Sequence, residues 1–398
     1  MKNKLRVFYA LGPGNVVESY RNWKERTDVS TETSITFSSQ FFDYCKEVDA
    51  EVYAISSNDA KELLQDDNFL LENRPKENPQ SKGLNWHWQQ WRYAQGLLKS
   101  AKAFKADVAL FDSGTTHWFM LSSFAKAGIP VIASLHNALW PVGFPPQGKV
   151  QRLILWLNGR FWRNTVSASI CISPTCKQQI IMCAQHPKGP IFVYKPKFRE
   201  QFFTSFLLAQ PLFKKPLTIL FAGRIEENKG ALDILKIAEK VEQGRPGQCQ
   251  WHICGGGSQE DKLKHEIEAR MLQKNVHYLG KQPREALLQQ FNWAQLAIVP
   301  TTSTFGEGLS LVAVEAFLAY RPTLTNPVVP AIDLLDGAIL NAKTDDIDSY
   351  VAAIFKILDH PQEIAQKIHF PLEIRQSFFG PRGGFADAIR AAIDATLK

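Results

Sequence analysis

The sequence predicts an α/β protein built from two doubly wound, Rossmann-like domains that face each other across a central cleft. Short apolar runs of strand length alternate with helix-length segments twice along the chain, and glycine or polar turns follow several of these runs. This alternation is typical of parallel sheets covered by helices on both faces. The 398 residues, 45% of them hydrophobic, are also enough to build two sizeable cores.

The first half of the chain supplies one series of elements, which we assign to a domain over residues 1–208. Strands are expected at 5–11, 51–56, 107–111, 130–135, 169–172 and 191–194, and helices at 16–24, 86–105 and 153–163. The pattern then lapses at 209–216, where two prolines and two lysines interrupt it. We interpret this segment as the interdomain linker.

The second half repeats the alternation and predicts a second domain over residues 209–375. Its strands are expected at 217–222, 250–254, 276–279, 296–299, 323–325 and 338–340, and its helices at 231–243, 260–273, 284–292 and 349–358. Ligands of such sheets bind beyond the carboxyl ends of the strands. Two facing domains therefore predict one cleft between those edges.

The composition argues against several classes of protein. The six cysteines form no CxxC pair and share no metal-ligand spacing with the histidines, so we expect buried free thiols, a reducing cytoplasm and no metal. No apolar run approaches the roughly 18 residues that cross a bilayer, so we expect neither a signal peptide nor a membrane-spanning helix. The net charge of +7 favours an anionic partner: nucleotide phosphates, anionic lipid or nucleic acid. No RRM, KH or helix-turn-helix signature supports nucleic acid.

A basic loop follows the first strand of the second domain. Arg224 and Lys229 stand five residues apart between Gly223 and Gly230, at the edge of the sheet where this fold class binds ligands. An Arg fork and a Lys point charge together would neutralise a diphosphate. The alternative is a surface loop in which these cations pair with the adjacent glutamates.

Two carboxylates, Glu307 and Glu315, stand eight residues apart after the strand at 296–299. A helix is expected to begin near Ser310, so the carboxylates project to roughly the same side, near the backbone amides of Gly308, Leu309 and Ser310. Amides at a helix start favour an anion, and carboxylates accept bonds from hydroxyls. A ligand with both phosphate and sugar hydroxyls fits this pair. The alternative is an ordinary solvated loop and helix.

Three weaker signals remain. Gly14 lies in the turn GPGN after the first strand, and Gly255 lies in CGGGS after the strand at 250–254, but neither turn has the glycine spacing of a dinucleotide fingerprint. His136 ends a strand and would face the cleft, although a lone histidine is more often structural. Asp346 and Asp348 stand at a helix start, where N-capping explains them better than metal binding.

Four segments together resemble glycosyltransferase family 4, whose members are retaining, sugar-nucleotide-dependent enzymes of the GT-B fold. They are AGRIEENKG, CGGGS, NVHYLG and FGEGLSLVAVEAF, in this order and spacing over residues 217–322. The last segment matches the family's Glu-x7-Glu motif. The resemblance is thinner across the first half, where GPGN and His136 match expected positions.

The resemblance implies a role for each matched position. Arg224 and Lys229 would hold the donor diphosphate, Glu307 the hydroxyls of the donor sugar, and Glu315 the ribose hydroxyls. Gly14 and His136 would reach in from the first domain, and the last segment, 376–398, would cross back to that domain. The catalytic group would comprise Glu307, His136, Arg224 and Lys229, and the donor-binding group Gly14, Arg224, Lys229, Gly255, Tyr278, Leu279, Glu307, Gly308, Leu309, Ser310, Leu311 and Glu315.

The implied reaction moves a hexose-type sugar from a nucleotide diphosphate sugar to a hydroxyl of a saccharide, polysaccharide or lipid-linked acceptor. Retention would follow from attack on the departing face, with no metal or cofactor and with a UDP-sugar favoured over a GDP-sugar. Two alternatives stay open: a sugar-nucleotide epimerase, and a non-catalytic nucleotide-sugar-binding protein. The chain departs from the family pattern after Glu315, in 318–322 and 326–330, and at Asn137, where an aspartate is common.

Two segments of the first domain are both aromatic and basic. One contains Trp86, Trp88, Trp91, Arg92, Lys99, Lys102 and Lys105, and the other Trp156, Arg160, Trp162 and Arg163. They are expected either to rest on an anionic membrane, as in enzymes that glycosylate lipid-linked acceptors, or to be core tryptophans beside solvated lysines. The predicted location is the cytoplasm, with or without peripheral contact at the inner face of the membrane.

Overall fold

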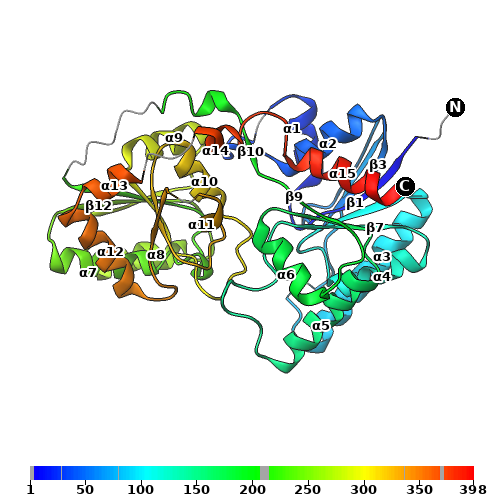
Figure 1. The fold of residues 1–398 in the computed structure, drawn as a ribbon, viewed down its shortest axis with the longest axis horizontal. Helices are drawn as coiled ribbons and strands as arrows, with labels where there is room; N and C mark the ends of the chain where they lie inside the picture. Colours follow the sequence, from blue (N-terminus) through cyan, green and yellow to red (C-terminus); the bar gives the residue numbers. More distant parts are fainter. Residues whose placement is uncertain (1–3, 28, 79, 207–214, 336, 368–371) are drawn as a thin grey trace.

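The computed structural model describes residues 4–27, 29–78, 80–206, 215–335, 337–367 and 372–398. It has two α/β lobes side by side (Figure 1). The α/β class and the arrangement in two lobes are confirmed. The predicted linker at 209–216 lies almost entirely outside the described residues. The division at 208 and 375 stays a prediction.

The first lobe is built on an eight-stranded sheet in the order β4-β5-β3-β1-β6-β7-β8-β9. Neighbouring strands are parallel except for β4, which pairs antiparallel with β5 at the edge. The strands are β1 (Arg6–Ala10), β3 (Glu51–Ser56), β4 (Glu62–Asp66), β5 (Phe69–Asn73), β6 (Val108–Asp112), β7 (Val131–Leu135), β8 (Ala168–Cys171) and β9 (Ile191–Val193); β2 (Ser34–Ile35) and β10 (Lys197–Phe198) form a separate two-stranded pair.

Helices cover both faces of this sheet because its central strands are buried on both sides. Tyr9, Phe111 and Leu135, for example, are fully buried. The helical segments are α1 (Val16–Lys24), α2 (Phe37–Glu47), α3 (Gly83–Phe104), η1 (Trp118–Leu121), α4 (Ser122–Lys126), α5 (Lys149–Asn164), α6 (Pro174–Ala184) and η2 (Glu200–Phe202).

The second lobe is built on a six-stranded parallel sheet in the order β13-β12-β11-β14-β15-β16. Its strands are β11 (Leu217–Ala222), β12 (Cys249–Cys254), β13 (Val276–Gly280), β14 (Leu296–Val299), β15 (Thr323–Thr325) and β16 (Ile339–Asn341). Its helices are η3 (Glu227–Lys229), α7 (Asp233–Gly244), α8 (Glu260–Ala269), α9 (Arg284–Trp293), α10 (Leu311–Leu318), α11 (Ala331–Leu334), α12 (Ile347–Asp359), α13 (Gln362–Gln366) and α14 (Leu372–Gln376).

In each sheet, successive strands are added first on one side of the first strand and then on its other side. This reversal of direction sets the position of the site in each lobe. In the first lobe the reversal lies between β1 and β6, and in the second between β11 and β14. Loops that leave two such strands diverge and open a crevice at the carboxyl edge of the sheet. The Arg224–Lys229 loop follows β11 and the Glu307 loop follows β14, so both loops leave the sheet at this edge.

The last helix, α15 (Phe385–Leu397), packs against α2 and β8 of the first lobe (Figure 1). Arg390 pairs with Glu47 at 2.5 Å, and the side-chain oxygen of Gln40 accepts a bond from the amide of Phe385 at 2.8 Å. Asp346 caps α12 by accepting a bond from the amide of Ser349 at 3.0 Å, as predicted. All six cysteines are free, and five of them are buried.

Candidate functional site

A cavity of about 970 Å³ lies between the lobes at the carboxyl ends of both sheets. From the first lobe, Gly14 and His136 line it, together with the loop before α2. From the second lobe it is lined by the loops after β11 and β12 and by one side of α10. Six of the predicted site residues lie on its wall, namely Gly14, His136, Arg224, Gly255, Leu311 and Glu315.

The two glycine-containing loops of the second lobe interlock at the floor of this cavity. Gly255 has φ +143°, and a Cβ built on it would lie 1.7 Å from the carbonyl oxygen of Gly223. A Cβ on Gly257 would lie 2.5 Å from the carbonyl oxygen of Ile225. Backbone packs directly on backbone here, so both positions require glycine. The glycines of the CGGGS turn therefore expose backbone atoms, without side chains, to a ligand in the cavity.

Lys229 and Glu307 form an ion pair at 2.5 Å, which joins the loops after β11 and β14. Glu307 also accepts a hydrogen bond from the hydroxyl of Thr301 at 3.2 Å. The Lys229 ammonium lies 4.2 Å from the centre of the Phe305 ring, and the Arg224 guanidinium lies 5.7 Å from the same centre. The two predicted cations therefore converge on one side of the Glu307 loop. Arg224 is exposed, whereas Lys229 and Glu307 are largely buried.

The Glu307 loop touches the first lobe through its backbone. The amide of Ala138 donates to the carbonyl oxygen of Gly306 at 3.2 Å. A Cβ on Gly308 would lie 2.0 Å from the carbonyl oxygen of His136, so any side chain there would collide with the first lobe. The amides of Gly308, Leu309 and Ser310, just before α10, donate no backbone hydrogen bond to another described residue. All three residues are buried and none lines the cavity, so their role in binding an anion stays a prediction.

Glu315 is the buried carboxylate of α10, and its nearest partner comes from the other lobe. The hydroxyl of Thr33, in the loop before α2, donates a hydrogen bond to Glu315 Oε1. Burial raises the pKa of Glu315 to about 7, while the Thr33 bond lowers it and the neighbouring charge of Glu32 raises it. This carboxylate therefore sits in the cavity wall with its charge only weakly stabilised.

His136 lies in a polar cluster at the carboxyl ends of β1, β6 and β7. Its Nε2 is 3.0 Å from Asp112 Oδ1 and 3.1 Å from the hydroxyl of Ser134, and its Nδ1 is 2.6 Å from the hydroxyl of Tyr194. The hydroxyl of Tyr9 donates to the other oxygen of Asp112 at 2.5 Å. Phe37 stacks on the imidazole at a centroid distance of 4.5 Å. Both ring nitrogens and one face of the ring therefore have partners.

The remaining predicted residues lie behind the wall. Tyr278 donates its hydroxyl to the carbonyl oxygen of Gly255 at 2.9 Å, which braces the CGGGS turn from outside. The cavity wall near β13 is formed instead by Lys281 and Gln282. The predicted residues that are not on the wall are Lys229, Tyr278, Leu279, Glu307, Gly308, Leu309 and Ser310.

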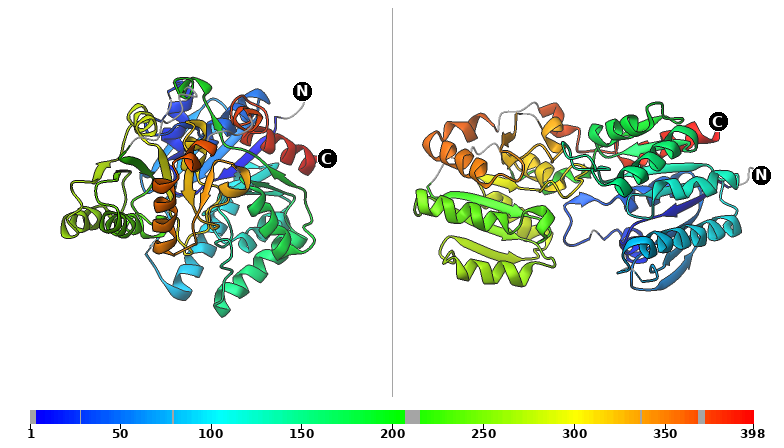
Figure 2. Two further views of the ribbon diagram at one scale, coloured as in Figure 1. Left: turned by 60° about the vertical axis from the view of Figure 1, so that its left-hand side comes forward. Right: turned by 90° about the horizontal axis from the view of Figure 1, so that it is seen from below.

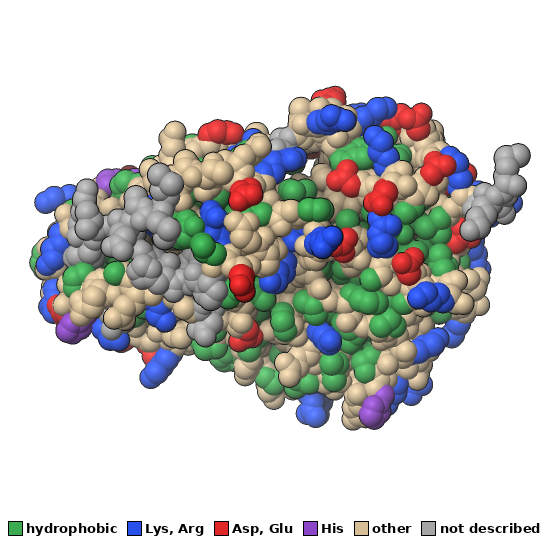
Figure 3. Space-filling model, turned by 45° about the horizontal axis from the view of Figure 1, so that its top comes forward, with side chains coloured by type: hydrophobic (Ala, Val, Ile, Leu, Met, Phe, Trp, Pro, Cys, Tyr) green, Lys and Arg blue, Asp and Glu red, His purple; other side chains and the backbone are tan. Residues whose placement is uncertain are grey.

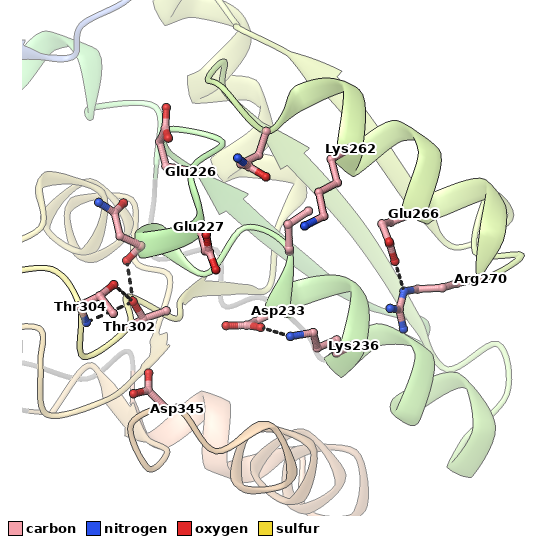
Figure 4. A pocket seen from close by; sticks show the side chains of 13 residues that line it. Glu226, Glu227, Asp233, Lys236, Lys262, Glu266, Arg270, Thr302, Thr304 and Asp345 are labelled. Carbon is pink, nitrogen blue, oxygen red and sulfur yellow. Dashed lines mark hydrogen bonds and ion pairs between the residues drawn. The ribbon is translucent and has the colours of Figure 1, made fainter. Parts of the chain in front are cut away.

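A second cavity of about 690 Å³ lies on the far side of the Arg224–Lys229 loop, against α7 and α8 (Figure 4). Four of its eight charged side chains pair with one another. Asp233 binds Lys236 at 2.8 Å, and Glu266 binds Arg270 at 2.9 Å. None of the predicted site residues lines this cavity, so we place the site in the larger cavity between the lobes.

Sequence reasoning missed Thr33 and the partners of His136. The segment 29–38 is rich in Ser and Thr, and it forms one side of the cavity. Its polar composition between two helices was the only signal available. Tyr9 and Tyr194 lie within apolar strand-like runs, which predict burial but not a bond to a site residue. Among the described residues, no cluster of three or more His, Cys, Asp or Glu side chains is arranged to hold a metal ion.

Comparisons with known proteins agree with this geometry. Residues 206–369 match the family model "Glycosyl transferases group 1", and residues 43–194 match "Glycosyltransferase Family 4". A glycogen synthase of Mycobacterium tuberculosis is 28% identical over 152 residues, which are 37% of this chain and 35% of that protein. The chain thus aligns with about a third of the length of this curated relative.

Two solved structures share the fold over nearly the whole chain. Anabaena HepE in complex with UDP has a TM-score of 0.64 at 13% identity, and covers 98% of this chain and 99% of its own. The trehalose 6-phosphate synthase of Burkholderia multivorans has a TM-score of 0.71 at 13% identity, and covers 99% of this chain and 96% of its own.

The two-lobed fold and the family matches place the protein among the GT-B glycosyltransferases. The two family models match most of both lobes, from residue 43 to residue 369 with a short gap. The chain belongs to the glycosyltransferases of family 4 type, and the resemblance seen in the four sequence segments is confirmed.

Proposed function

We propose that this protein is a retaining glycosyltransferase that moves a hexose-type sugar from a UDP-sugar to a hydroxyl of a saccharide or lipid-linked acceptor. One observation supports this most: the cavity between the lobes brings together the bare CGGGS backbone, Arg224 and Glu315, beside the Lys229–Glu307 pair. Cations and main-chain groups suit a diphosphate, and carboxylates suit hydroxyls.

The proposed chemistry follows from these charges. Cleavage of the anomeric bond places negative charge on the departing diphosphate, which Arg224 and Lys229 would stabilise more in the transition state than in the ground state. Glu307 would orient the donor sugar while Lys229 holds the carboxylate in place. No described side chain on the cavity wall stands out as a covalent nucleophile, which favours attack by the acceptor on the departing face.

UDP is favoured as the nucleotide because the HepE structure binds UDP within the same fold.

The proposed location is the cytoplasm, with or without peripheral contact at a membrane. In the described part of the chain, every helix is too short or too polar to cross a bilayer.

A screen of UDP- and GDP-sugars tests the proposal. The shift in melting temperature identifies the donor, and release of nucleotide in the presence of candidate acceptors then measures transfer. Arg224→Ala should lower turnover at least about tenfold, equivalent to about 1.4 kcal/mol, because its exposed guanidinium faces the diphosphate position. Lys236→Ala, in the neighbouring cavity, is the matched control and should leave turnover unchanged.

The alternatives give different results in this assay. A binding protein would shift its melting temperature without releasing nucleotide with any acceptor. An epimerase would convert the sugar while the nucleotide stays attached. Loss of activity in Lys236→Ala but not in Arg224→Ala would move the site to the neighbouring cavity.

A further inference from the structure

The first lobe contains a long segment that is almost free of acidic residues. Residues 78–199 contain fifteen Lys and Arg but only two carboxylates, Asp107 and Asp112, a formal charge of +13 against +7 for the whole chain. Asp107 accepts a hydrogen bond from the amide of Arg6 at 2.8 Å, and Asp112 is buried beside His136. In Figure 3, acidic and basic side chains alternate over the upper part of the right-hand lobe, whereas its lower part shows basic side chains without acidic ones.

Ten of the fourteen large hydrophobic side chains that are exposed in the described structure lie in this segment, and seven of these ten lie on two helices and one loop. The N-terminal turns of α3 and α5 project from the first lobe in the same direction (Figure 2, left), and both helices pack against η1. We call their exposed apolar side chains the α3–α5 face: Leu84 (89% exposed), Trp88 (54%), Trp91 (42%), Phe144 (44%), Val150 (61%), Leu153 (54%) and Trp156 (56%).

Basic side chains accompany this face. Lys149 and Arg152 are exposed on the first turn of α5, and the Arg160 guanidinium lies 5.1 Å from the centre of the Trp156 ring. Trp88 and Trp91 stack at 4.7 Å. Neither α3 nor α5 contains an Asp or Glu. Not every aromatic side chain in these helices belongs to the face, since Trp162 is fully buried in the core and Trp86 packs against His87 and His117.

A groove of about 470 Å³, lined by both apolar and polar side chains, lies next to this face. Trp140, Phe144 and Leu155 of the first lobe line one side, and Ser303 and Thr304 line the other. These two hydroxyl residues belong to the loop that carries Glu307. The groove therefore runs from the exposed end of α5 to the loop that we assign to the donor sugar.

We propose that the α3–α5 face docks on an anionic lipid bilayer and that the groove receives part of a membrane-anchored acceptor. This inference rests on the proposed function, because it specifies the acceptor of that site. An exposed apolar face among basic side chains gains both from burial at the lipid interface and from anionic headgroups. A soluble protein partner would need acidic complementarity over the same area, but would not explain a groove that leads to the Glu307 loop.

Vesicle co-sedimentation of the full chain tests the docking. The probes are vesicles of phosphatidylcholine alone, and of phosphatidylcholine with phosphatidylglycerol. The protein should bind the anionic vesicles at least about tenfold more than the neutral ones, and the excess should fall as salt is raised. Leu153→Glu and Trp88→Glu should each abolish most of this binding. Leu63→Glu is the matched control, because Leu63 is 66% exposed on β4 at the far edge of the same sheet.

The outcomes separate this inference from the proposed function. Melting-temperature shifts with UDP, measured on the same variants, report the donor site and should not change. The docking would be overturned if the protein sedimented equally with both kinds of vesicle, or if Leu153→Glu bound vesicles as well as wild type. The proposed function would still stand in that case, provided that UDP still shifts the melting temperature. Self-association that Leu153→Glu abolishes, without vesicle binding, would also overturn it and assign the face to a second copy of the chain.

Discussion

The hydroxyl of Thr33 donates a hydrogen bond to the carboxylate of Glu315, across the cavity that separates the two lobes. The residues are 282 positions apart in sequence, and both are buried. Because the proposed role of Glu315 is to accept ribose hydroxyls, Thr33 occupies one of the positions that a nucleotide would need. Thr33 thus presents to this carboxylate the same kind of donor that a ribose hydroxyl would offer.

The raised pKa of Glu315 predicts a pH-dependent stability. Burial raises this pKa from its ordinary 4.5 to about 7, so the folded protein binds a proton between these values that the unfolded chain does not. The resulting stabilisation is fully present below about pH 4.5 and is lost as pH rises to about 7. The free energy of unfolding should decline across this window, by at most about 3 kcal/mol from this group.

Glu315→Gln should remove that decline and be more stable than wild type above pH 7, as measured by chemical denaturation from pH 5 to pH 8. The exposed substitution Glu268→Gln is the control and should reproduce the wild-type profile. Identical pH profiles for Glu315→Gln and wild type would show that the carboxylate does not titrate in this range.

The Lys229–Glu307 pair predicts that two of the proposed site residues also support the fold. Lys229→Ala would leave the largely buried Glu307 without its cation and should cost about 3 kcal/mol of unfolding free energy, in addition to at least about a tenfold loss of turnover. The double variant Lys229→Met with Glu307→Gln should recover much of the stability but none of the activity. The exposed Arg224→Ala should lose activity only. If Lys229→Ala unfolds at the same denaturant concentration as wild type, the pair is not structurally important.

The strands that the sequence predicted are those that are buried on both faces of a sheet. The central strands are buried on both faces, so each gives an apolar run, and β11, β12, β14 and β15 lie within a residue or so of the predicted ranges. The hairpin of β4 and β5 was missed because β4 is an edge strand, half-exposed and antiparallel, whose sequence ELLQD carries no such run.

For the site, the sequence predicted groups that lie on loops next to strand ends, such as Arg224, Lys229 and Glu307. The family resemblance implied that Gly14 and His136 reach in from the first lobe, but nothing in the sequence predicted which residues touch across the cavity. The Thr33–Glu315 bond and the contact of Gly308 with His136 depend on how two sheets approach each other, and no local pattern encodes that approach. The sequence also could not separate the two tryptophans of α5. Trp162 is buried in the core, whereas Trp156 is exposed.

The close approach at Gly308 predicts a strong effect of a single methyl group. In Gly308→Ala the Cβ would lie 2.0 Å from the carbonyl oxygen of His136, so the Glu307 loop or the first lobe must move. Turnover should fall at least about tenfold because a small displacement of the reacting groups is costly. Gly96→Ala in α3, whose Cβ would meet nothing within 4 Å, is the matched control and should leave turnover unchanged. Full activity in Gly308→Ala would show that the observed approach of the lobes is not needed for catalysis.

The contacts of His136 predict that Asp112 is a positioning residue. Asp112 accepts from Tyr9 with one oxygen and contacts His136 Nε2 with the other, whereas an asparagine has only one oxygen for these two groups. Asp112→Asn should therefore loosen the imidazole on the cavity wall and lower kcat about tenfold, with little change in the KM of the donor. Tyr194→Phe keeps the Asp112 contact and removes only the bond at Nδ1, so its kcat should fall less. A rise in KM at constant kcat for Asp112→Asn would instead place His136 in donor binding, and equal losses in both variants would mean that the cluster acts as one structural unit.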